Sequence, residues 1–167
     1  MHGNNFKALD DMQKSWPDAF SARTVLELGS GGVDRSFRDG YFTGAIGYIG
    51  VDIVAGVNVD VVAPAATLTF PKESFDTIIS FSMLEHDPDW RNSILHNISS
   101  LKKGGYLLMC WGAEGNLHHG PEPWALVPAM DVLEALRSAG MTILDSFFEE
   151  HRYGPDCVGA FDVVARR

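Results

Sequence analysis

The chain has 167 residues, of which 46% are hydrophobic, and this length and composition fit one compact domain spanning 1–167. Its formal net charge of −9 disfavours nucleic-acid binding, because phosphate contacts need a clustered basic face and the only basic pairs are Lys102-Lys103 and Arg166-Arg167. With no apolar leader and no run long enough to span a membrane, we expect a soluble, cytoplasmic protein.

The first half of the chain alternates between strand-like and helix-like segments. One short helix is expected at 5–16, before the apolar run "TVLEL" (24–28). This run is ended by glycine and is typical of a strand buried on both faces. The runs "YIGVDI" (48–53), "DTIISFS" (76–82) and "YLLMCW" (106–111) have the same character. The pattern predicts four buried strands.

Two amphipathic helices separate the later strands. The segment "WRNSILHNISSL" (90–101) has helical periodicity and is followed by a stop signal, "KKGG" (102–105). A second helix, 128–140, is opened by proline and closed by glycine. After it, 141–150 and 158–167 predict two successive strands with no helix between them. Alternation followed by a terminal hairpin predicts a mainly parallel sheet with an antiparallel strand at or near one edge.

One interval interrupts this alternation. Only five residues, "VAGVN" (54–58), separate the strand 48–53 from the apolar run "VDVVA" (59–63). A parallel return through a crossover helix needs about a dozen residues. The run 59–63 is therefore either a short edge strand reached by an extended loop or a hairpin partner. In both cases we expect that side of the sheet to be thinly covered.

A glycine-rich turn follows the first strand in "VLELGSGGVDR" (25–35). Gly29 and Gly31 allow a close backbone approach, and Asp52, 21 residues beyond Gly31, ends the next strand, where a carboxylate can accept hydrogen bonds from a ribose diol. Alone this is a weak signal, and an ordinary strand-to-helix turn remains the alternative. Asp34 replaces the small residue that a dinucleotide site needs, and with Glu27 it disfavours phosphate. Both acids favour a cofactor with an ammonium and a sulfonium group, such as S-adenosylmethionine.

These segments resemble the class I S-adenosylmethionine-dependent methyltransferases, in particular the small branch grouped as methyltransferase type 11. The matching pieces are "VLELGSGG", "YIGVDI", "FPKESFDTIISFSMLEHDPD" and "LKKGGYLLM", in order across residues 25–109. The resemblance implies an α/β fold with a Rossmann-like, doubly wound sheet of order 3-2-1-4-5-7-6, in which strand 7 is antiparallel. It also implies methyl transfer from S-adenosylmethionine to an acceptor, either a small molecule or a group on a glycan, lipid or protein.

The resemblance further implies a cofactor site. Glu27 would lie near the methionine end of the cofactor and Asp52 would hold the ribose hydroxyls. The turn residues would lie against the cofactor, Ile53 would line one adenine face, and the end of the fourth strand would offer backbone carbonyls to the amino group. The implied contacts are Glu27, Gly29, Ser30, Gly31, Asp52, Ile53, Phe81 and Ser82.

Position 64 departs from the family pattern. Family members commonly carry an acid where this chain has Pro64, and that acid often meets the adenine amine. Proline offers no such side chain, so adenine recognition would rest on backbone groups near Ala65 and on apolar contact. We expect a correspondingly modest cofactor affinity.

Glu85 and His86 are the candidate catalytic residues. They follow the strand 76–82, where the family places the substrate side of its cofactor site. A base is needed only if the methyl acceptor is a protonated group such as a hydroxyl, and His86 could be that base. The alternative is that "LEH" starts a helix and that its side chains hold the loop.

The likeliest substrate loop is "CWGAEGNLHHGPEPW" (110–124), which follows a strand and is rich in glycine and proline. We expect substrate contacts from Trp111, His118, His119 and Trp124. The 24 residues before the first motif leave little room for a lid. The pocket is therefore expected to be open, or completed by a second copy in a homodimer or by a partner.

We expect no metal site and no disulfide. The adjacent histidines His118 and His119 have no carboxylate or cysteine at convincing ligand spacing. Cys110 and Cys157 are too few for a disulfide framework, and their apolar, strand-like surroundings indicate reduced core residues.

Two other functions compete with an active methyltransferase. The first is a catalytically silent methyltransferase-like binding module, which Pro64 and the missing crossover helix favour and the complete Glu27, Gly29, Gly31 and Asp52 set opposes. The second is a nucleotide-cofactor oxidoreductase, which Asp34 and the antiparallel ending oppose.

Overall fold

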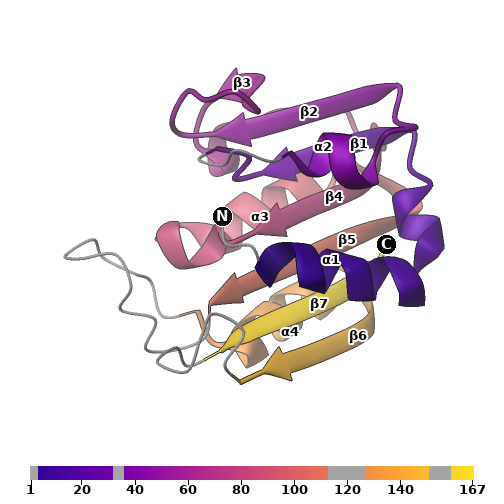
Figure 1. Ribbon diagram of the computed structural model, residues 1–167. Coiled ribbons are helices and arrows are strands. Elements are labelled where there is room, and N and C mark those ends of the chain that lie inside the picture. The colour runs from indigo at the N-terminus through magenta and orange to yellow at the C-terminus, as the bar shows by residue number, and fades with distance from the viewer. Residues whose placement is uncertain (1–3, 32–35, 113–126, 151–158) are drawn as a thin grey trace.

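Seven strands form one sheet in the part of the chain that the computed structural model describes, residues 4–31, 36–112, 127–150 and 159–167 (Figure 1). Their order is β3-β2-β1-β4-β5-β7-β6, and only the two pairings of β7 are antiparallel. The predicted sheet order and the antiparallel strand 7 are confirmed. The strands are β1 (Thr24–Leu28), β2 (Gly47–Asp52), β3 (Val61–Val62), β4 (Phe75–Phe81), β5 (Leu101–Gly112), β6 (Thr142–Glu149) and β7 (Ala160–Arg166).

Helices cover both faces of the sheet, as expected of a doubly wound α/β fold. On one face lie α1 (Asn4–Ser15) and α2 (Phe37–Tyr41), and on the other α3 (Trp90–Ile98) and α4 (Ala129–Ser138) (Figure 1). Each layer buries its own core, one around α1 and α2 and one around α3 and α4. Three short 3₁₀ helices join the elements: η1 (Pro17–Phe20), η2 (Ala65–Thr67) and η3 (Leu84–His86).

Because their strands run parallel, four strand ends lie on the same side of the sheet. This side is called the carboxyl-end edge below and is distinct from the outer strands β3 and β6. The carboxyl ends of β1, β2, β4 and β5 all lie at this edge, on the left in Figure 1. In open α/β sheets ligands bind outside the carboxyl ends of the strands. The start of α1 lies at the same edge, because its first turn contacts residues at the ends of β4 and β5.

The edge strand β3 is parallel to β2, with Val51 opposite Val61 and Asp52 opposite Val62. Of the two alternatives for residues 59–63, the short edge strand is therefore correct and the hairpin partner is wrong. No helix lies in the interval 54–58, as predicted. A parallel return this short is possible because β3 pairs over only two residues. The side of the sheet is thinly covered, and Ile53 is 67% exposed.

The structure corrects the predicted start of β5. The strand begins at Leu101 rather than at Tyr106, so Gly104 and Gly105 lie within β5 and do not form a turn before it. The register against β4 shifts here, from Phe75 opposite Leu101 to Thr77 opposite Tyr106. Gly104 has a φ of +77°, and a Cβ on Gly105 would lie 2.8 Å from the carbonyl oxygen of Asp76. The two glycines therefore allow a bulge, not a helix stop.

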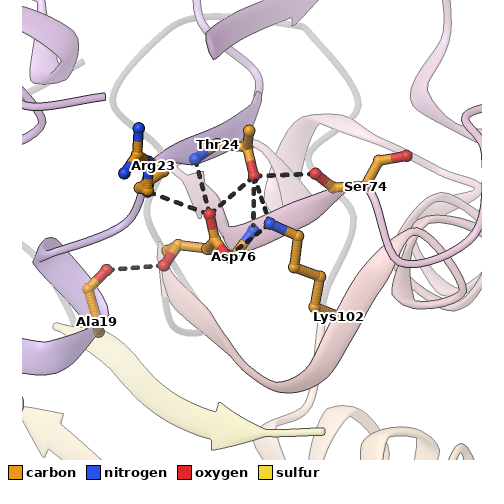
Figure 2. A network of polar contacts seen from close by, with 7 residues as sticks. Ala19, Arg23, Thr24, Ser74, Asp76 and Lys102 are labelled. Carbon is orange, nitrogen blue, oxygen red and sulfur yellow. Dashed lines mark hydrogen bonds and ion pairs between the residues drawn. The ribbon is translucent and has the colours of Figure 1, made fainter. Parts of the chain in front are cut away.

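A polar network joins β1, β4 and β5 at the amino-terminal ends of these strands (Figure 2). One oxygen of Asp76 accepts hydrogen bonds from the backbone N–H groups of Arg23 and Thr24 and from the Thr24 hydroxyl, at 2.8–3.1 Å. Its other oxygen accepts from the Lys102 ammonium at 2.7 Å. These contacts hold the amino-terminal ends of three strands together, far from the carboxyl-end edge.

Candidate cofactor and active site

Asp52 is held firmly at the carboxyl end of β2. Its Oδ2 accepts a hydrogen bond from the Gly31 N–H at 2.8 Å, and its Oδ1 accepts one from the Val54 N–H at 3.0 Å. A Cβ at position 31 would lie 2.7 Å from Asp52 Oδ2, so the turn requires glycine there. Because each carboxylate oxygen has a further lone pair, Asp52 is a fixed acceptor for two more hydrogen bonds.

The turn after β1 packs directly on the segment after β4. The N–H groups of Gly29 and Ser30 both donate to the carbonyl oxygen of Val51, at 2.8 and 3.0 Å. Gly29 has a φ of +82°, and a Cβ there would lie 2.7 Å from Met83 Cβ. Ser30 is fully buried, and its Oγ has no hydrogen-bond partner among the described residues. Two sequence-predicted loops are thus brought into contact.

Glu27 is buried in β1 and is 2% exposed. Its Oε2 accepts a hydrogen bond from the Tyr48 hydroxyl of β2 at 2.6 Å. Burial raises the pKa of Glu27 to about 7, although the Tyr48 hydrogen bond and the charge of Arg38 lower it. The Arg38 guanidinium lies 4.6 Å from the centre of the Tyr48 ring and pairs with Asp60. Glu27 is therefore a buried carboxyl one residue before the end of β1, with a pKa raised toward neutral.

Phe81 and Ser82 end β4 at the same edge. Phe81 is buried, and Ser82 has a φ of +51°, which non-glycine residues seldom adopt. The Ser82 N–H donates to the carbonyl oxygen of Cys110 at 2.8 Å, and the Ser82 hydroxyl accepts from the Asn5 side-chain amide at 2.8 Å. The end of β4 is thus fixed from β5 and from α1.

Pro64 and Ala65 lie beyond β3. Pro64 precedes η2 and is exposed, and its carbonyl oxygen accepts from both the N–H and the hydroxyl of Thr67. Ala65 is buried, and its carbonyl oxygen accepts from the Asn97 amide at 2.9 Å and from the Leu68 N–H at 3.4 Å. Both lone pairs of that carbonyl are engaged, so it is not available to a ligand.

Glu85 and His86 differ sharply in their surroundings. Glu85 is 5% exposed, and its Oε1 accepts from the Gly112 N–H at 3.2 Å, which joins η3 to the end of β5. Its Oε2 has no hydrogen-bond partner in the described part of the chain. Burial raises the pKa of Glu85 to about 7, although backbone N–H groups lower it. His86 is exposed at the end of η3.

Trp111, predicted to contact substrate from a loop, instead lies within β5 and is fully buried. Its indole N–H donates to the carbonyl oxygen of Val127 at 3.0 Å, and its ring stacks on Phe161 at 5.6 Å. This is the environment of a core residue, since the indole is buried, hydrogen-bonded and stacked on a second aromatic ring. The sequence placed Trp111 at the end of a strand but did not show that its side chain packs into the core.

Other predicted residues fall outside the described residues: Asp34, His118, His119, Trp124 and Cys157. Cys110 is described, and it is buried, as predicted. Within the described ranges, no three His, Cys, Asp or Glu side chains come together as a metal site would require. The helices of those same ranges include none with the length and hydropathy of a membrane span.

The sequence analysis missed two residues that shape this edge. Tyr48 had a usable signal, since an acid within a buried strand needs a hydrogen-bond donor and Tyr48 is a polar-tipped residue of the neighbouring strand. Asn5 had none. Its partner Ser82 is 77 positions away, and only the docking of α1 onto the sheet brings the two together.

Several solved structures with a similar fold are methyltransferases. The 1,6-didemethyltoxoflavin-N1-methyltransferase of Burkholderia thailandensis, solved with S-adenosylhomocysteine, is similar over 99% of this chain and 78% of its own, with a TM-score of 0.72 and 18% identity. YcgJ of Bacillus subtilis is similar over 97% of this chain and 98% of its own, with a TM-score of 0.73 and 14% identity. The [4+2]-cyclase SpnF is similar over 96% and 80%, with a TM-score of 0.71 and 19% identity. No curated protein matches the sequence.

The sheet order is that of the class I methyltransferases, and the family match agrees. The family described as "Methyltransferase domain" matches residues 3–129, and the chain belongs to this family. It is an S-adenosylmethionine-dependent enzyme that transfers a methyl group to an acceptor.

The described residues fit this cofactor. Asp52 supplies a fixed pair of acceptors suited to a diol, and Glu27 supplies a buried carboxyl suited to a cationic group. Exposed Ile53 offers an apolar surface beside Asp52. The close contact of Gly31 with Asp52 leaves no room for a side chain between the turn and the acid.

Proposed function

We propose that the cofactor binds across the carboxyl ends of β1, β2 and β4 within one catalytic domain, 1–167. The observation that carries this proposal is the fixation of the Asp52 carboxylate by the N–H groups of Gly31 and Val54. A preorganised carboxylate binds hydroxyl groups without the entropic cost of ordering its own side chain. Asp52 would hold the ribose hydroxyls, and Ile53, which is exposed next to it, would cover one face of the adenine.

Glu27, Gly29, Ser30 and the end of β4 complete the proposed cofactor contacts. Glu27 would balance the positive charge of the methionine moiety, because a buried carboxylate interacts strongly with a cation in surroundings of low dielectric. The backbone of Phe81 and Ser82 would accept hydrogen bonds from the amino group. Adenine recognition would use apolar contact near Pro64, since the Ala65 carbonyl is already doubly engaged.

His86 is the proposed general base for a hydroxyl acceptor. Bound cofactor supplies a methyl group already activated by the sulfonium, so the chain has to orient the acceptor and remove its proton. His86 is exposed beside the end of β4, and an imidazole near neutral pH can take that proton. Buried Glu85 is better suited to position η3 against Gly112 than to meet a substrate directly.

The acceptor is proposed to bind near η3, with His118, His119 and Trp124 as the contacts that the sequence predicts. A complex of a putative methyltransferase with the Trm112 activator of Haloferax volcanii has a similar fold, with a TM-score of 0.62, 16% identity, and coverage of 99% of this chain and 98% of that one. This likeness supports a partner protein as the element that completes the pocket, and a second copy of this chain is the alternative. A cytoplasmic location fits both roles.

The test is a calorimetric titration with S-adenosylmethionine, S-adenosylhomocysteine and NAD. We expect the first two to bind at one site per chain and NAD not to bind. Binding of NAD alone would overturn the proposal. Incubation of the protein with methyl-labelled cofactor and pools of hydroxylated small molecules, glycans, lipids and peptides then identifies the acceptor class by label transfer.

A further inference from the structure

Ser82 has an unusual backbone conformation at a position where the cofactor site needs accuracy. Its φ of +51° lies in the left-handed region, which an L-residue with a Cβ adopts only at an energetic cost. The residue is neither glycine nor asparagine, so its neighbours must hold it there. The next residue, Met83, packs against Gly29 of the turn after β1, so a change at Ser82 would also move that turn.

Two contacts hold Ser82 in this conformation. Its N–H donates to the carbonyl oxygen of Cys110 on β5, and its hydroxyl accepts from the Asn5 amide on α1, both at 2.8 Å. The Cys110 thiol in turn lies 3.8 Å from Asn5 Oδ1, within the range of a hydrogen bond from sulfur. Asn5 of α1, Ser82 after β4 and Cys110 of β5 thus form one cluster at the carboxyl-end edge, in which Asn5 and Cys110 are buried.

Asn5 is fully buried in the first turn of α1. A buried side-chain amide costs free energy unless it is hydrogen-bonded, so an apolar residue would serve simple packing better at this position. The helix that carries it is itself anchored from other elements. The Tyr41 hydroxyl donates to Asp10 Oδ1 at 2.7 Å and lies 3.0 Å from the Phe6 carbonyl oxygen, and Lys7 pairs with Glu149 at 2.9 Å.

We propose that Asn5 is a positioning residue of the cofactor site, which makes α1 part of that site. Asn5 holds Ser82 in the left-handed conformation, and this conformation directs the backbone at the end of β4 toward the bound cofactor. The inference rests on the proposed cofactor site at β1, β2 and β4. It assigns the amino-terminal helix a role in binding in addition to its role in covering the sheet.

The decisive comparison is Ser82→Ala against Ser82→Gly, with cofactor affinity measured by calorimetry. Both variants lose the hydrogen bond to Asn5, but only alanine pays the cost of the left-handed conformation, since glycine adopts positive φ freely. We expect Ser82→Ala to raise the dissociation constant of S-adenosylmethionine about tenfold and Ser82→Gly to stay within about threefold of wild type. Equal affinities of the two variants would overturn the proposal.

Asn5→Ala tests the same contact from the helix. We expect about a tenfold loss of affinity, and recovery in the double variant Asn5→Ala/Ser82→Gly. A double variant as weak as Asn5→Ala would mean that Asn5 does not act through the Ser82 conformation. Thr77→Val is the matched control, since it removes a buried hydrogen bond at the other end of β4, from Thr77 to the Ala19 carbonyl oxygen. It should lower the unfolding temperature and leave affinity unchanged.

Asp52→Ala separates failure of this inference from failure of the proposed site. If Asp52→Ala weakens binding and neither Asn5→Ala nor Ser82→Ala does, the cofactor site stands and the role of Asn5 is wrong. If none of the three changes affinity, the cofactor binds elsewhere and the proposed site itself is wrong.

Discussion

Asp52 is the residue on which cofactor affinity should depend most directly. Replacing it with alanine removes both acceptors at the end of β2, and we expect binding of S-adenosylmethionine to weaken by about 1.5–3 kcal/mol, the range for hydrogen bonds to a charged group. Asp52→Asn is the control, because it keeps the shape and one acceptor and should lose less. Titration calorimetry gives both values, and an Asp52→Ala affinity equal to that of wild type would contradict the ribose assignment.

His86 should affect turnover and not cofactor binding. If the acceptor is a hydroxyl, His86→Ala should lower turnover by about 10²–10⁴-fold, the usual scale for a general base, with nearly unchanged cofactor affinity. Wild-type activity should decrease at pH values below the pKa of the imidazole, and the pH profile of the variant should lack this decrease. If His86→Ala turns over an identified hydroxyl acceptor at the wild-type rate, His86 has a structural role in the loop and is not the base.

Single residues were predictable where their chemistry depends on local sequence. Gly31 and Asp52 were identified from the glycine turn and the acid at the next strand end, and the structure joins them by a hydrogen bond. The structure adds a second reason for glycine at 31, namely the close approach of the Asp52 carboxylate. Trp111 was misassigned because a residue at the end of a strand can face either the core or a ligand, and the sequence does not show that its ring is buried.

At the scale of elements, the Asp76 network should stabilise the fold without affecting the site. Although burial opposes it, hydrogen bonds from Lys102 and Thr24 hold the pKa of Asp76 below its usual value (Figure 2). The folded-state pKa is depressed, so this contribution to stability is present above the unfolded pKa, about 3.9, and is lost as the pH falls through the lower folded value.

Asp76→Asn should therefore lower the unfolding temperature at pH 7 and reduce the loss of stability between pH 4 and pH 2. Thermal unfolding followed by circular dichroism measures both effects. Cofactor affinity should not change, because the network lies at the amino-terminal ends of the strands and Asp52 lies at the carboxyl end of β2. An unfolding temperature of Asp76→Asn equal to that of wild type at pH 7 would mean that the network contributes nothing.

Elements were predictable in kind, and less so in their limits. Helix α4 and the strands β6 and β7 lie where periodicity and the flanking proline and glycine put them. The start of β5 was wrong because two glycines signal a helix stop and a bulge equally well, and the choice depends on the neighbouring strand. The five-residue helix α2 has too few turns to show a period, so the sequence analysis did not identify it.

At the scale of the molecule, burial raises the pKa values of two carboxyl groups among the described residues, Glu27 and Glu85, to about 7. In the unfolded chain such groups titrate near 4.3. Between these values the folded state binds more protons than the unfolded state, so stability falls as the pH rises. The contribution is complete below the unfolded pKa and is lost as the pH passes through about 7.

The wild-type unfolding temperature should accordingly decrease from pH 5 to pH 8. Glu85→Gln keeps the shape of the side chain and remains uncharged, so it should flatten this dependence, and Glu27→Gln should do the same. Calorimetric scans at several pH values provide the test. If the wild-type unfolding temperature increases toward pH 8 instead, burial does not raise the pKa values of these two carboxyl groups in the folded protein.

The topology as a whole was predictable because alternating strands and helices, followed by a terminal hairpin, permit few arrangements. The acceptor was not predictable, because the residues that would select it follow β5 and precede α4, where the sequence has no periodic pattern. The proposed cofactor site could be predicted from the sequence because its residues belong to short motifs at the ends of β1, β2 and β4.

A crystal structure of the protein with S-adenosylhomocysteine is the most direct test of the proposed cofactor site. We expect the ribose hydroxyls within hydrogen-bond distance of both Asp52 carboxylate oxygens, the adenine against Ile53, and the amino group at the backbone of Phe81 and Ser82. The contacts of Asp52 with Gly31 and Val54 should persist in the complex. A cofactor bound away from Asp52, or at the amino-terminal ends of the strands, would show that the proposed site is wrong.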